Sequence, residues 1–147
     1  AENKNTPVEL LAVLAQDEDY WVRCAVAEKG STTADVLAVL AKDDVYEVRT
    51  EVAANGNTSA DILAMLAKDI NFDVRASVAQ NNNTPVETLV MLASDKEWWV
   101  RQAVAGNKNA PIETLVFLSK DNNEWVSEAA KEALKERKEE SKTSMER

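Results

Sequence analysis

Hydrophobic and polar residues recur along this chain with a period of 26 residues. In the first half of each period, apolar residues follow one another at steps of three and four, as in Leu11, Leu14 and Ala15. In the second half, two valines lie one helical turn apart, as in Val22 and Val26. Steps of three and four place side chains on one face of a helix. The pattern therefore predicts two short amphipathic helices in every period.

The segments between these helices carry residue types that begin and end helices. Most first helices follow a motif such as Asn-Thr-Pro-Val-Glu at 83–87. In this motif we expect Thr at the N-cap, Pro at the first helical position and the acid completing a capping box. After the second helix we expect a left-handed turn at Asn or Gly. The expected N-cap threonines are Thr6, Thr32, Thr58 and Thr84, and the expected turn residues include Gly30, Asn55, Gly56, Asn81 and Asn107.

A fixed period of this length is typical of stacked helical repeats. We expect residues 1–130 to form a solenoid, with repeats at about 5–30, 31–56, 57–82, 83–108 and 109–130. The fifth copy departs from the pattern, since Ser127 replaces an Arg. Residues 124–147 are rich in helix formers and charge, which predicts a polar C-terminal capping helix with a frayed tail in the same single domain.

The motif Asp-x(4)-Val-Arg-x-x-Val-Ala, combined with Asn-Thr-Pro-x-Glu-x-Leu-x-x-Leu-Ala, resembles the leucine-rich repeat variant family, which is related to HEAT and armadillo repeats. The resemblance extends over residues 3 to about 130. It implies an all-α, right-handed superhelix of five helix-turn-helix repeats, with 3-10 helix allowed in one arm of each repeat. It implies no single activity, because such arrays are usually recognition scaffolds and a fold alone does not define a function.

An Arg follows the first Val of the second helix in four successive repeats, at Arg23, Arg49, Arg75 and Arg101. Two interpretations are open. Each Arg can form a structural ladder by reaching an Asp of the acidic turn or a carbonyl of the adjoining repeat. Alternatively, the four cations can converge on nucleic acid, although a net charge of -9 disfavours a phosphate backbone as partner.

Some positions vary strongly while the rest of the repeat is constant. These are positions 21, 24 and 28 of the first repeat and their equivalents in the other repeats. Positions 24 and 28 follow position 21 by three and seven residues, so all three lie on one stripe of the second helix. We expect this stripe to face solvent and bind a partner, since exposed Trp is favoured in interfaces. The candidate partner-binding residues are Trp21, Cys24, Glu47, Asp73, Trp99, Gln102 and Trp125.

The chain contains no His and one Cys. These counts exclude Ser-His-Asp chemistry, Cys-His chemistry and His-ligated metals within the chain. The acidic turns also lack the spacing of a calcium-binding EF-hand loop. We therefore expect no catalytic activity, no cofactor and no metal site.

Charge and hydropathy narrow the function further. The apolar fraction is 45%, but no apolar run is long enough to cross a bilayer. The acidic excess lies in the repeats, which favours a basic or amphipathic partner. We therefore predict a protein or peptide interaction scaffold of cytoplasmic location, with its oligomeric state left open. The chain begins at Ala1 rather than Met, so both a trimmed chain and a removed leader stay open.

Overall fold

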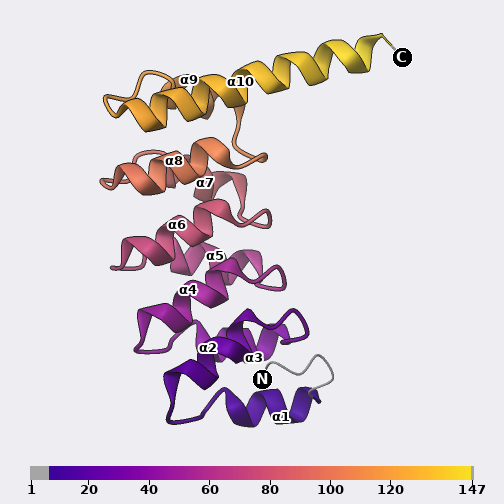
Figure 1. Ribbon diagram of the computed structural model, residues 1–147, viewed down its shortest axis with the longest axis vertical. Coiled ribbons are helices and arrows are strands. Elements are labelled where there is room, and N and C mark those ends of the chain that lie inside the picture. The colour runs from indigo at the N-terminus through magenta and orange to yellow at the C-terminus, as the bar shows by residue number, and fades with distance from the viewer. Residues whose placement is uncertain (1–6, 147) are drawn as a thin grey trace.

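The computed structural model describes residues 7–146 as a stack of paired α-helices (Figure 1). Within this range there are ten helices and no strand, which confirms the predicted all-α class. The first helices of the five repeats are α1 (Val8–Leu14), α3 (Ala34–Leu40), α5 (Ala60–Leu66), α7 (Val86–Leu92) and α9 (Ile112–Leu118). The second helices are α2 (Tyr20–Glu28), α4 (Tyr46–Ala54), α6 (Phe72–Gln80), α8 (Trp98–Gly106) and the long α10 (Glu124–Met145).

The helices form two layers with one continuous apolar core between them. Successive second helices pack directly on one another, whereas each first helix packs mainly on its neighbouring second helices. The core is built from the apolar positions that the sequence pattern identifies, and residues such as Leu63, Val78 and Ala79 are fully buried. Figure 1 shows the stack rising from α1 to α10, with the C-terminal part of α10 extending beyond it.

Both helices of each described repeat are α-helices, so the 3-10 arm that the resemblance allowed is absent from residues 7–146. Hydrogen bonds of the 3-10 type occur at helix ends and in the turns between helices. In the first repeat the amide of Gln16 donates to Val13 at 3.0 Å, and the amide of Asp17 donates to Leu14 at 3.1 Å. Such bonds tighten the last turn of a helix whose carbonyls would otherwise lack partners.

The prediction that Thr is the N-cap is wrong. The N-caps lie one residue later, as at Pro85, and Thr84 precedes them. The buried Thr84 hydroxyl instead donates to the carbonyl of Val78, at 2.5 Å, near the end of the preceding helix. A buried loop must satisfy its backbone groups internally, and this bond does so. Thr32 and Thr58 make the same contact, and Thr6 lies outside the described residues.

The predicted left-handed turns are also wrong, because no residue in the described range has a positive φ. The second helices end on extended residues such as Asn81, with φ of -70° and ψ of 128°. The side-chain amide nitrogen (Nδ2) of Asn81 donates to two backbone carbonyls in the preceding repeat, those of Ala53 at 2.8 Å and Asn55 at 3.0 Å. Two residues later, the side chain of Asn83 donates to the carbonyl of Gly56 at 2.6 Å. These asparagines therefore link neighbouring repeats.

The last repeat completes this asparagine ladder in a different way. Helix α10 does not end where the other second helices end, so the positions equivalent to Asn81 and Asn83 are Ala133 and Lys135. Arg137, one turn further along, donates to three carbonyls between α8 and α9, and two of them, those of Asn107 and Lys108, are carbonyls that the two asparagines would bind. The acceptors are Ala110 and Lys108, each at 2.6 Å, and Asn107 at 3.4 Å.

We expect Arg137→Ala to lower the free energy of unfolding by about 1.5 kcal/mol, because three carbonyls lose a charged donor. The neighbouring exposed residue provides the control, and Lys138→Ala should leave stability nearly unchanged. Urea unfolding followed by circular dichroism measures both variants, and hydrogen exchange in α9 and α10 reports where protection is lost. Equal effects of the two substitutions would contradict this role of Arg137.

Candidate functional site

The four arginines of the ladder are bound within the protein. Arg75 donates from Nε to Oδ2 of Asp95 in the next repeat, at 2.7 Å, and from Nη2 to Oδ1 at 2.9 Å. Its Nη1 donates to the carbonyls of Asp69, at 2.8 Å, and Ile70, at 3.2 Å, in its own repeat. The side chains of Arg75 and Asp95 are each only 8% exposed. The same bidentate pairing occurs in Arg23–Asp43, Arg49–Asp69 and Arg101–Asp121.

The pairing lowers the pKa of the Asp carboxyl groups. At Asp95 burial has the largest influence and raises the pKa, because it disfavours the charged form. The hydrogen bonds from Arg75 and from the amide of Glu97, together with the Arg75 charge, outweigh burial and bring the pKa below its ordinary value. The hydrogen bonds described above occupy the guanidinium donors with partners inside the protein. A nucleic-acid site built on this ladder is not favoured.

The structure places the variable residues of the second helices at different depths. Trp21, Trp99 and Trp125 are exposed, with Trp99 at 49%, and Glu47, Asp73 and Gln102 are half-buried. The expectation that Cys24 faces solvent is wrong, because its side chain is buried. Cys24 belongs to the apolar core. Burial is also the main reason why the pKa of the Cys24 thiol is raised.

Two open hollows lie side by side on this layer, over α4, α6 and α8. The first has a volume of about 240 Å³ and is lined by Tyr46, Glu47, Thr50, Glu51, Asp73, Ala76, Ser77, Gln80 and Trp99. The second has a volume of about 270 Å³ and shares Gln80 and Trp99 with the first. Its remaining lining residues are Gln102, Ala103 and Gly106. We call the surface formed by Glu47, Glu51, Asp73, Gln80, Trp99 and Gln102 the second-helix face.

Sequence reasoning missed Glu51, although it lines the first hollow. Glu51 lies four residues after Glu47, so both carboxylates are on the same face of α4. The equivalent positions in other repeats hold small residues such as Ser77 and Ala103, which gave no sign of an exposed surface. The signal that could have found Glu51 is its spacing of four residues from the variable position 47.

The first hollow combines negative charge with an aromatic wall. Glu47, Glu51 and Asp73 form no salt bridge with any residue in the described part of the chain. Burial, followed by the charge of Glu28, raises the pKa of Glu51. Trp99 packs edge to face against Trp98, with ring centroids 5.2 Å apart, which orients the indole at the rim. This arrangement suits a cationic side chain that can contact both carboxylate and indole.

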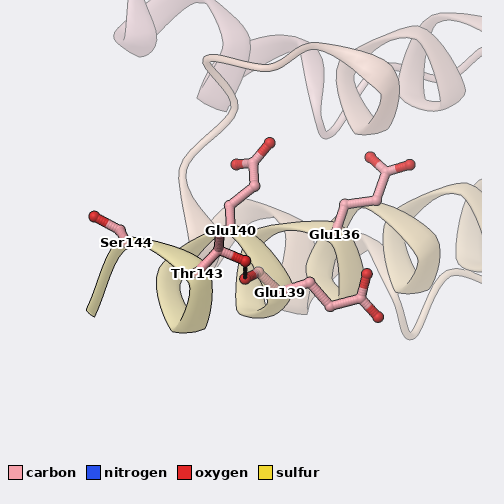
Figure 2. A pocket seen from close by; sticks show the side chains of 5 residues that line it. All are labelled: Glu136, Glu139, Glu140, Thr143 and Ser144. Atoms are coloured by element: carbon pink, nitrogen blue, oxygen red, sulfur yellow. Dashed lines mark hydrogen bonds between the residues drawn. The ribbon is translucent and has the colours of Figure 1, made fainter. Parts of the chain in front are cut away.

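A larger hollow, of about 540 Å³, lies along α10 and is lined by Glu136, Glu139, Glu140, Thr143 and Ser144 (Figure 2). All five residues come from a single helix, so no second element closes the space. The Thr143 hydroxyl donates to the carbonyl of Glu139 at 3.0 Å, within that helix. No group of His, Cys, Asp or Glu within residues 7–146 is arranged to hold a metal ion. We therefore place the candidate site on the second-helix face.

A family model described as "Leucine rich repeat variant" matches residues 72–97, which cover α6, α7 and the turn after α7. Residues 72–97 therefore match a leucine-rich repeat variant repeat. The other repeats follow the same residue pattern in register with the matched segment. The leucine-rich repeat variant repeat is a structural scaffold, and it defines no substrate or partner.

A solved structure described as a leucine-rich repeat variant with a novel repetitive protein structural motif is similar to this chain. The two are 25% identical, the match covers 88% of this chain and 72% of that one, and the TM-score is 0.45. No curated protein matches the sequence. In the described part of the chain, every helix is too short or too polar to cross a bilayer.

We expect Arg75→Ala to lower the free energy of unfolding by about 3 kcal/mol, because the buried Asp95 carboxylate loses its charged partner. Urea unfolding followed by circular dichroism is the measurement. Lys131→Ala is the control, since Lys131 forms an exposed pair with Glu128 at 2.7 Å and such pairs contribute about 0.5 kcal/mol. If Arg75→Ala lowers the free energy of unfolding no more than Lys131→Ala does, the ladder does not stabilise the stack.

The same pairing makes stability depend on pH. Because the pKa of Asp95 is lowered in the folded chain, Asp95 makes its full contribution to the free energy of unfolding above the ordinary carboxyl pKa of about 4. The contribution is lost as the pH falls through the lower, folded-state pKa. We expect the difference in unfolding free energy between the parent and Asp95→Asn to shrink below pH 4. A difference that is constant from neutral pH down to pH 2 would contradict this linkage.

Proposed function

We propose that this chain is a non-catalytic interaction scaffold that binds a basic segment of a protein or peptide on the second-helix face. The observation that carries this proposal is the first hollow, where the exposed Trp99 and three carboxylates without a salt bridge line the same space. An Arg or Lys side chain of the partner enters the hollow. Its charge is held by Glu47 and Asp73, and its cationic head contacts the Trp99 ring.

The neighbouring hollow extends this site along the stack. Gln80 and Trp99 belong to both hollows, so a peptide that crosses α6 meets the carboxylates first and the polar Gln102 next. The shallow, open shape fits an extended segment with side chains directed into successive hollows. The stack itself supplies a rigid frame, since the Arg and Asn ladders fix the spacing of the second helices.

A binding experiment with matched charge controls tests the proposal. The probe is a short, fluorescently labelled peptide of alternating Arg and Ala, and the readout is fluorescence anisotropy. We expect Asp73→Asn and Trp99→Ala each to weaken binding about tenfold, which corresponds to ~1.4 kcal/mol. Glu113→Gln removes the same charge from α9 in the other layer, and Trp125→Ala removes another exposed Trp. Both controls should leave affinity nearly unchanged.

Equal weakening by Asp73→Asn and Glu113→Gln would mean that the peptide senses only the net charge of the chain. That outcome, or tight binding unaffected by Trp99→Ala, would refute the second-helix face as the site. Binding should also weaken as salt is added, because the carboxylates are partly exposed to solvent.

A further inference from the structure

The first helices carry an exposed apolar residue at the same position in all five repeats. These residues are 42–67% exposed and form what we call the apolar row: Val13, Val39, Met65, Met91 and Phe117. Single exposed apolar residues are common on protein surfaces and need no explanation. Five in register are different, because the stack aligns them into one continuous line. In each first helix a fully buried Leu lies two residues before the row residue, on the opposite side of the helix, so the main core contact of the helix does not require an apolar residue here.

Further exposed apolar residues lie beside the row on α7 and α9. Val86 and Val90 on α7, and Ile112 and Val116 on α9, are also exposed, each between 42% and 54%. Together with Met91 and Phe117 they give six exposed apolar side chains on helices of successive repeats. A contiguous apolar surface of this kind on a folded chain indicates a site of contact with another molecule.

Charged residues border the apolar row on both sides. An acid lies one turn before each member of the row, and all five are exposed: Glu9, Asp35, Asp61, Glu87 and Glu113. One turn after the row the exposed residues are Gln16, Lys42, Lys68, Ser94 and Lys120. The acids have a local role, because negative charge in the first turn is favourable for a helix. The surface as a whole nevertheless has an apolar centre with a negative border and a mainly positive border.

We propose that this surface binds one amphipathic α-helix of a partner protein, lying along the stack. The apolar stripe of the partner helix covers the apolar row. Its basic flank lies over the acids such as Glu87, and its acidic flank lies over the lysines such as Lys68. This surface belongs to the first-helix layer, so the proposal is independent of the basic segment bound on the second-helix face.

The spacing of the repeats favours a helix as the occupant. The second helices of successive repeats are in direct contact, which places their axes about 8–10 Å apart. The first helices pack mainly on these second helices rather than on one another, so they follow one another at a spacing at least as large. An α-helix advances about 10.5 Å in seven residues. One apolar residue per heptad can therefore meet one repeat after another. A β-strand returns a side chain to the same face every ~6.8 Å, which does not match the repeat.

The probe is a fluorescently labelled synthetic peptide of several heptads. Each heptad has Leu at the first position, Ala at the fourth, Lys along one flank and Glu along the other. We expect the double variant Met91→Gln, Phe117→Gln to weaken binding of this peptide about tenfold, measured by anisotropy. Glu113→Gln should weaken it about threefold. Ile70→Gln is the matched control, because Ile70 is 92% exposed but lies in the turn before α6, away from the row.

Three results would overturn the proposal. The first is unchanged affinity of the double variant. The second is equal binding of a peptide with a central Pro, since Pro breaks the helix. The third is self-association of the parent chain that the double variant abolishes, because the occupant would then be a second copy. Asp73→Asn should not affect this peptide, so a failure here is distinguishable from a failure of the second-helix face.

Discussion

The bidentate contact between an Arg of one repeat and an Asp of the next is the interaction on which the rest of the stack depends. Both partners are nearly buried, so removing either one leaves a buried charge unpaired and strongly lowers the free energy of unfolding. The partners are separated by 20 residues at every junction. The same guanidinium binds the carbonyls of its own turn. One side chain thus sets both the shape of the turn and the distance to the next repeat.

The arrangement of helices was predictable because hydrophobic periodicity is a strong and repeated signal. The helix ends were not, and Thr84 shows why. A Thr-Pro-x-Glu motif satisfies every local requirement of a capping box, but the hydroxyl binds Val78 across a loop. Asn81 is similar, since its partners lie in the preceding repeat. Local motifs do not reveal contacts that form only when repeats stack.

The candidate site was predictable in part for the same reason. Asp73 and Trp99 stand at a position that varies between repeats, which marks a surface free of structural demands. Cys24 varies equally but is buried in the apolar core. Arg137 gave no signal, since it lies in a highly charged segment beyond the aligned repeats. Its role follows only from the carbonyls that the last repeat presents.

The contribution of Arg137 also bears on how such an array changes length. Interior junctions all use the same Arg, Asp and Asn contacts, so a duplicated unit of 26 residues inserted between two repeats would find complementary neighbours on both sides. The C-terminal junction differs, because Arg137 binds the carbonyls of Asn107 and Lys108 in place of two asparagines, and Ser127 provides no guanidinium. A unit placed after α10 would instead find no guanidinium at position 127 for its Asp, so the contacts of the interior suit an added repeat better than those of the last repeat do.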